Sequence, residues 1–141
     1  MRILAIDLGL TRTGLAVCDK GELMASPLKV ITQRDFALLL QEIAEIAKAE
    51  NIEQIVLGHP LNMDGSAGES AQRSEQFAEK LSGLTQLPVV LRDERGTTVS
   101  AHRALNTTNV RGKKRKAVVD AVAATIILQN YLDYRKNRKK E

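Results

Sequence analysis

The chain has 141 residues, 43% hydrophobic and 27% charged, as in one globular domain that buries roughly two-thirds of its unfolded surface. No stretch approaches the roughly 20 apolar residues of a membrane span, and Asp7 interrupts the first apolar run before a signal peptide forms. The single Cys18 excludes an intramolecular disulfide, and no Cys/His spacing indicates zinc. We therefore expect a cytoplasmic protein with no membrane partner.

The net charge of +4 is unevenly distributed along the chain. Residues 1–102 hold 10 Lys/Arg and 14 Asp/Glu, a balance of −4, whereas residues 103–141 hold 11 and 3, a balance of +8. The basic residues form two runs, at 111–116 and 135–140. Such runs are either solvated segments or contacts for a polyanion such as nucleic acid. Aromatic residues make up only 3%, which argues against base stacking on an aromatic platform.

The first elements are strands. Runs at 2–7 and 13–19, joined by "LGLTR", predict an antiparallel pair, and a third strand is expected over about Leu23–Thr32. Pro27 within it predicts an edge strand or a bulge.

Helices and strands then alternate. A helix is expected over 34–51, where apolar residues recur at i, i+3 and i+4; they are Phe36, Leu39, Leu40, Ile43, Ile46 and Ala47. The remaining expected elements are a strand at 52–58, a loop with a turn at Asp64-Gly65, a helix at 69–83, a strand at 87–94, a helix from Thr97 or Thr98, and a last helix at 117–132.

This order, β-β-β-α-β-α-β-α-α, predicts an α/β fold with a mixed five-stranded sheet. Three antiparallel strands come first, helix crossovers add parallel strands, and helices cover both faces. We expect a single domain over 1–141, with a mobile basic loop at about 106–116 and a basic C-terminal tail at 135–141.

Carboxylates stand where burial is costly. Asp7 ends one apolar strand, Asp93 and Glu94 end another, and Asp120 lies in a helix that is apolar nearly all round. Each has a structural alternative, as the start of a turn or, for Asp120, as a partner of the helix dipole. Strand ends at one edge of an open sheet are also where ligand sites form.

Clustered carboxylates repel one another unless cations are present. Hard oxygen ligands with room for water are what Mg²⁺ or Mn²⁺ prefers, and two such ions would support phosphodiester hydrolysis. The run "DLGLTRTGLAV" is also similar to the phosphate-binding hairpin of the actin, sugar-kinase and heat-shock ATPase superfamily. Those proteins clamp a nucleotide between two lobes, whereas 141 residues supply only one, so we do not adopt this interpretation.

Four motifs in order, "IDLGLTRTGLAVCD", "VLGHPLNMDGS", "DERGTT" and "VVDAVAATIILQNYL", resemble the signatures of the YqgF family, also called RuvX, over essentially the whole chain. The resemblance implies an RNase H-like fold and a nuclease of either precursor 16S rRNA or Holliday junctions. It places the family's acidic positions on Asp7, Glu94 and Asp120 as catalytic residues and metal ligands, with Asp93 as the alternate for the second position.

The resemblance also matches Arg12 and Gly14 to the first hairpin, and Asn62, Asp64 and Gly65 to the second loop. His59 and Gly96 depart from the family pattern, and we interpret His59 as a loop variant rather than a general acid. We expect phosphate contacts from Arg12 and from the basic run, whose residues are Arg111, Lys113, Lys114, Arg115 and Lys116. Asn62 and Asp64 of the second loop are expected to bind the substrate as well.

The sequence thus predicts a metal-dependent nuclease that processes the 5′ end of precursor 16S rRNA in ribosome biogenesis. Two alternatives stay open: a Holliday-junction resolvase-like DNA nuclease, and a non-catalytic RNA-binding assembly factor. The partner is nucleic acid, precursor rRNA or branched DNA, and the sequence does not distinguish a monomer from a homodimer.

Overall fold

The computed structural model describes residues 1–61, 64–93 and 113–139, with side chains of the last helix from 122 to 138. Its elements, in chain order, are β1 (Ile3–Asp7), β2 (Arg12–Cys18), β3 (Ala25–Thr32), α1 (Phe36–Ala49), β4 (Gln54–His59), α2 (Glu69–Thr85), β5 (Val89–Asp93) and α4 (Lys113–Lys139). The helix expected from Thr97 or Thr98 lies outside the described residues.

The strands form one mixed sheet in the order β3-β2-β1-β4-β5. β1 pairs antiparallel with β2, and β2 with β3, whereas β4 runs parallel to both β1 and β5. The predicted architecture is confirmed. Because β1 and β4 are parallel, their carboxyl ends meet at the same edge of the sheet.

Both predictions made from Pro27 are confirmed. Its strand β3 is an edge strand, where a residue without a backbone N–H interrupts the fewest ladder bonds. The register also shifts there: Leu15 pairs with Lys29, but Ala16 pairs with Pro27, which leaves Leu28 as the extra residue of a bulge.

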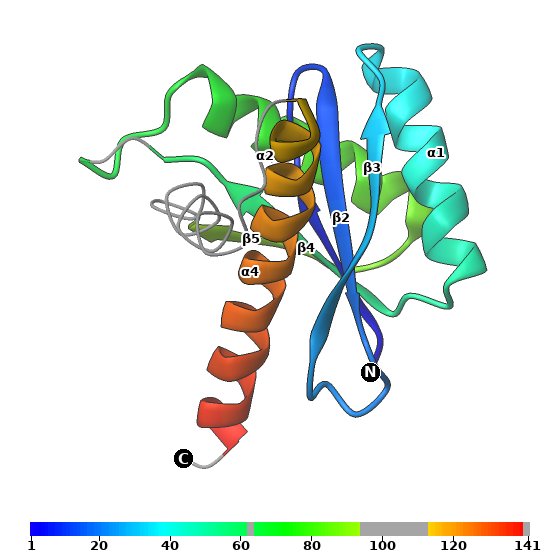
Figure 1. Cartoon of the computed structure of the whole chain (residues 1–141), viewed down its shortest axis with the longest axis vertical. Helices are drawn as coiled ribbons and strands as arrows, with labels where there is room; N and C mark the ends of the chain where they lie inside the picture. Colours follow the sequence, from blue (N-terminus) through cyan, green and yellow to red (C-terminus); the bar gives the residue numbers. More distant parts are fainter. Residues whose placement is uncertain (62–63, 94–112, 140–141) are drawn as a thin grey trace.

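Alternate strand residues build two cores, one on each face of the sheet. Leu4 and Ile6 pack with buried residues of α1 and α2, whereas Ile3 and Ala5 pack with buried residues of α4. Figure 1 shows the resulting layers, with α4 crossing one face and α1 and α2 on the other.

The stripe predicted for α1 is confirmed: Leu39, Ile43 and Ala47 are buried. Asp35 caps the helix, since its side chain accepts a hydrogen bond of 3.1 Å from the backbone N–H of Leu38.

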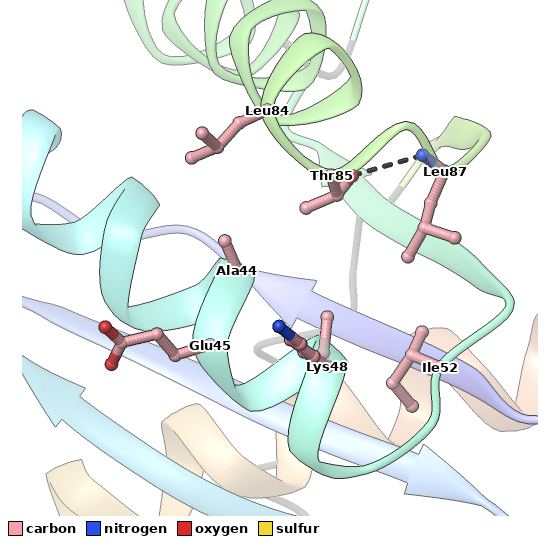
Figure 2. A pocket seen from close by; sticks show the side chains of 8 residues that line it. Ala44, Glu45, Lys48, Ile52, Leu84, Thr85 and Leu87 are labelled. Atoms are coloured by element: carbon pink, nitrogen blue, oxygen red, sulfur yellow. Dashed lines mark hydrogen bonds between the residues drawn. The ribbon is translucent and has the colours of Figure 1, made fainter.

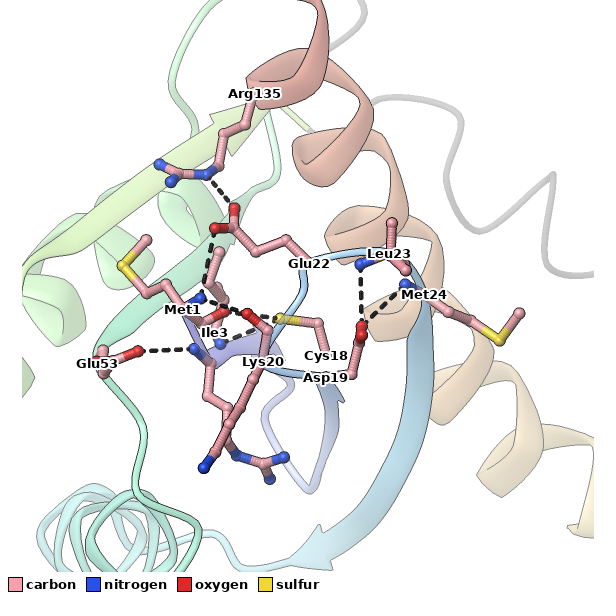
Figure 3. Close-up of polar contacts among 11 residues, drawn as sticks. Met1, Ile3, Cys18, Asp19, Lys20, Glu22, Leu23, Met24, Glu53 and Arg135 are labelled. Atoms are coloured by element: carbon pink, nitrogen blue, oxygen red, sulfur yellow. Dashed lines mark hydrogen bonds and ion pairs between the residues drawn. The ribbon is translucent and has the colours of Figure 1, made fainter. Parts of the chain in front are cut away.

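The helix α4 extends beyond the predicted 117–132 at both ends. It begins at Lys113, so positions 113–116 are helical where we expected the end of a loop, and it includes residues 135–139 of the expected tail. Lys and Arg are good helix formers, so these basic runs continue the helix. Nε of Arg135 donates a 2.6 Å hydrogen bond to Oε1 of Glu22, in the β2–β3 turn. Figure 3 shows that Glu22 also contacts the N-terminal amine.

Candidate functional site

Asp7 lies at the carboxyl edge of the sheet, on the face that α4 covers. It is the last residue of β1 and alternates with Ile3 and Ala5, whose side chains pack against that helix. Its antiparallel partner is Gly14, which has no side chain to fill the space beside the half-buried carboxylate. Asp7 is therefore part of the sheet and not the first residue of a turn.

The turn that follows brings a cation to the same face. A Cβ on Gly9 would lie 2.0 Å from the carbonyl oxygen of Arg12, so only glycine allows the hairpin to close this tightly. Arg12 begins β2 and alternates with Gly14 and Ala16. Ala16 belongs to the α4-side core, so Arg12 and Asp7 lie on one face, as a phosphate-contacting role for Arg12 requires.

The alternation of side chains along β5 places Asp93 on the other face of the sheet from Asp7. Val89 and Leu91 pack with the α1/α2 core, whereas Val90 packs with the α4 core. Asp93 alternates with Val89 and Leu91 and thus belongs to the face opposite Asp7. This placement disfavours Asp93 as a partner of Asp7 in a shared metal site.

His59 also lies away from Asp7. It is the last residue of β4 and pairs with Asp93. Its Nε2 is 3.6 Å from Oε1 of Glu75 on α2, which is within ion-pair range but too far for a hydrogen bond. Within the described residues this nitrogen makes no hydrogen bond. His59 is therefore a strand residue facing α2 and not a loop residue, and its position gives no support to a general-acid role.

Asp64 stabilises its own turn in the β4–α2 connection. Its Oδ1 accepts hydrogen bonds from the backbone N–H of Ser66, at 2.9 Å, and from the Ser66 hydroxyl, at 2.6 Å. Gly65 between them has a φ of 88°, in the left-handed region that favours glycine. The predicted substrate contact by Asp64 stays a prediction, while its turn-forming role is a finding.

The other predicted site residues lie outside the described residues, wholly or in their side chains. Three of them lie wholly outside: Asn62, Glu94 and Arg111. For five others the structure describes the backbone of α4 but not the side chains: Lys113, Lys114, Arg115, Lys116 and Asp120. Within the described residues, no three His, Cys, Asp or Glu side chains are grouped as a metal site. The Asp7 carboxylate supplies hard oxygen donors, the type of ligand that Mg²⁺ and Mn²⁺ prefer.

Sequence reasoning missed a cluster of arginine and tyrosine side chains between β5 and α4. The guanidinium carbon of Arg92 lies 4.4 Å from the ring centroid of Tyr134 and 5.7 Å from that of Tyr131. The sequence contains a pattern that could have indicated the cluster. Tyr131 and Tyr134 precede Arg135 and Arg138 by four residues each, the spacing of neighbours on a helix surface. Low aromatic content obscured it.

A groove of about 370 Å³ lies between the carboxyl ends of α1 and α2 (Figure 2). Apolar side chains, including the half-exposed Leu84, line it together with Glu45 and Lys48. It contains none of the predicted site residues, and it belongs to the layer opposite the face of Asp7.

No helix within the described part of the chain combines the length and apolar character needed to cross a membrane. A family model described as "RuvX: Holliday junction resolvase" matches residues 1–134. A relative from Ruminiclostridium cellulolyticum, named "Putative pre-16S rRNA nuclease", is 40% identical over 141 residues, covering 99% of both chains. A relative of the same name from Protochlamydia amoebophila is 43% identical, covering 95% of this chain and 94% of its own.

Among solved structures, Thermus thermophilus RuvC in complex with a Holliday junction substrate matches with a TM-score of 0.63 and 14% identity, over 97% of this chain and 96% of that one. A likeness at this identity shows the fold. The predicted RNase H-like fold is confirmed.

Proposed function

We propose that this chain, which belongs to the RuvX family of Holliday junction resolvases, is a metal-dependent nuclease that trims the 5′ end of precursor 16S rRNA in the cytoplasm. The observation that carries the proposal is the position of Asp7, a half-buried carboxylate at the carboxyl edge of the sheet beside Gly14. Full-length relatives named for pre-16S rRNA point to the substrate.

The proposed roles divide between holding metal and holding substrate. Asp7, Glu94 and Asp120 would hold Mg²⁺ or Mn²⁺, and two such ions, when bound, activate a water and stabilise the leaving oxygen of a phosphodiester. Arg12, on the same face as Asp7, would orient a phosphate next to the carboxylates. The lysines and arginines of 111–116 would bind flanking phosphates without reading sequence.

Cleavage of two substrates side by side tests the proposal. The purified chain with Mg²⁺ is expected to cut an RNA that carries the 5′ precursor segment of 16S rRNA, and not a four-way DNA junction. Asp7→Asn should reduce the rate by more than about 100-fold, since changes in groups that merely support metal ligands already cost 10–100-fold. Thermal stability without metal should hold or rise, because one repelling charge is removed.

The description of the family model as a Holliday junction resolvase favours a second candidate, junction cleavage. Preferential cutting of the junction would establish it in place of rRNA trimming. Binding of precursor RNA with no cleavage of either substrate, in Mg²⁺ and in Mn²⁺, would instead identify a non-catalytic assembly factor.

A further inference from the structure

The arginine–tyrosine cluster presents rings and cations together on the α4 side. The rings of Tyr131 and Tyr134 stack with centroids 6.3 Å apart and planes inclined by 23°. Arg135 and Arg138 each lie over one ring, at 5.8 Å from the centroid of Tyr131 and 5.7 Å from that of Tyr134. These four residues line a hollow of about 170 Å³, several times the roughly 30 Å³ that one water occupies in the liquid.

The cluster carries positive charge that the described residues do not neutralise. Glu22 pairs with Arg135 at 2.6 Å. Among the residues that the structure describes, Arg92 and Arg138 have no carboxylate within ion-pair distance. The partner that suits this surface is therefore an anion that also offers a flat face to an aromatic ring.

Packing alone accounts for Tyr131 but not for Tyr134. Tyr131 is 5% exposed and belongs to the α4-side core. Tyr134 remains 40% exposed, and Arg138 beside it donates a 3.3 Å hydrogen bond to the Tyr134 hydroxyl. An exposed ring therefore stands beside an arginine at the hollow.

Arg92 connects the cluster to the face of Asp7. It alternates with Val90, whose side chain belongs to the α4-side core, so it shares that face. Leu57 of β4 pairs with Ile6 on one side and with Leu91 on the other. Asp7 follows Ile6 on β1, and Arg92 follows Leu91 on β5. With β4 between them, their backbones are two strand spacings apart, about 10 Å. One strand of nucleic acid can span that separation.

We propose that Tyr134, with Arg138 and Arg92, binds an unpaired nucleotide a few positions along the same strand from the cleaved bond, since Tyr134 lies 14 residues, about 21 Å, along α4 from Asp120. The base stacks on the tyrosine and the arginines contact its phosphates. Unpaired bases expose the faces that aromatic side chains and guanidinium planes stack on. The inference rests on the proposed nuclease function for its substrate, but binding does not depend on cleavage.

Metal-free binding measurements on the full chain test the surface separately from catalysis. A single-stranded RNA with 2-aminopurine is titrated in EDTA, and its anisotropy and fluorescence quenching are followed. Tyr134→Leu should weaken binding by about fivefold or more, the low end of base–aromatic stacking, and abolish the quenching, whereas Tyr134→Phe should keep both. Arg138→Ala should weaken binding, and Lys80→Ala, on α2 of the opposite layer, should not.

Unchanged affinity and quenching in Tyr134→Leu, in a variant shown by circular dichroism to be folded, would overturn the inference and leave Tyr134 as a contact between α4 and β5. Failure of the wild type to bind the RNA would overturn it as well. Wild type that binds and quenches but never cleaves would refute the nuclease proposal alone.

Discussion

At the scale of single residues, the second metal ligand is either Asp93 or its neighbour Glu94. Asp93 belongs to the face opposite Asp7, and adjacent strand residues point to opposite faces. We therefore expect Glu94→Gln to lose more than about 100-fold in cleavage rate, and Asp93→Asn to stay near the wild-type rate. Steady-state cleavage with Mg²⁺ measures both. Loss in Asp93→Asn alone would reverse the assignment.

Cys18 provides a prediction about pH. Its Sγ donates to the carbonyl of Met1 at 3.4 Å and accepts from the N–H of Ile3 at 3.3 Å (Figure 3). Burial raises the pKa of this thiol above its ordinary 9.0, although the Ile3 N–H opposes the shift. Because the thiol has a higher pKa in the folded protein than in the unfolded chain, the unfolded chain loses this proton first as the pH rises. The free energy of unfolding should therefore fall as the pH rises above 9.0.

Urea unfolding at pH 7 and pH 10 measures that loss. The free energy of unfolding should fall less between these pH values in Cys18→Ala than in the wild type, because the titrating thiol is gone. Equal falls in the two proteins would show that the thiol does not contribute.

At the scale of elements, the pairing of Glu22 with Arg135 holds the last turns of α4 against the β2–β3 turn. Both side chains are partly buried, with 15% and 25% exposed. Arg135→Met should reduce stability by about 1–2 kcal/mol, between exposed and buried charged pairs, and lower Tm by about 3–6 °C. Thermal unfolding followed by circular dichroism measures the change.

The neighbouring Lys136→Met is the matched control, because Lys136 is exposed and no ion pair involves it within the described residues. It should stay within about 0.5 kcal/mol of the wild type. Equal effects of the two substitutions would show that the loss of charge on the helix, and not the pairing with Glu22, changes the stability.

Elements with one strong local signal were predictable from the sequence. The apolar period of α1 and the proline of β3 each have a direct structural consequence, and both predictions held. The ends of α4 were not predictable in this way, because a basic run can be a solvated segment or a helix. At the C-terminal end a distant contact accompanies the helical state, since Arg135 pairs with Glu22, 113 residues away in sequence. The cluster of Arg92 with the two tyrosines likewise arises only when β5 and α4 come together.

For the candidate site, the sequence identified Asp7 but left its environment open. The alternation of β1 decides that its side chain belongs to the α4 face, and the register with β2 decides that Gly14 lies beside it. The face that a strand residue occupies is a tertiary property. The structure places Asp93 on the face opposite Asp7, while Glu94 lies outside the described residues and stays a prediction from the resemblance.

At the scale of the whole molecule, the described residues that we propose to act on nucleic acid, Asp64 apart, lie on one side of the sheet. Asp7, Arg12 and Arg92 share the α4 face, and the basic run 111–116 leads into the same helix. The apolar groove belongs to the opposite layer. A nucleic acid that reaches the carboxylates along α4 should therefore meet most of its cationic contacts on this side alone.

The salt dependence of binding tests this asymmetry. For single strands, log K falls with log salt at about −0.7 per phosphate neutralised. Replacing Lys113, Lys114 and Lys116 by alanine should therefore flatten the slope for single-stranded RNA by up to about 2 units. The substitution should raise KM more than it lowers kcat, because these contacts are made equally before and during the chemical step.

A matched control removes the same charge from the other layer. Lys48 and Lys80 lie exposed on α1 and α2, and Lys29 pairs with Leu15 of the core that faces those helices. Replacing these three lysines by alanine leaves the net charge equal to that of the first triple variant, so any general effect of net charge appears in both. The slope should then stay within about 0.5 unit of the wild type, less than one neutralised phosphate. Equal flattening in the two variants would mean that the RNA responds to the overall charge of the protein, and a larger effect in the control would place it on the α1/α2 layer.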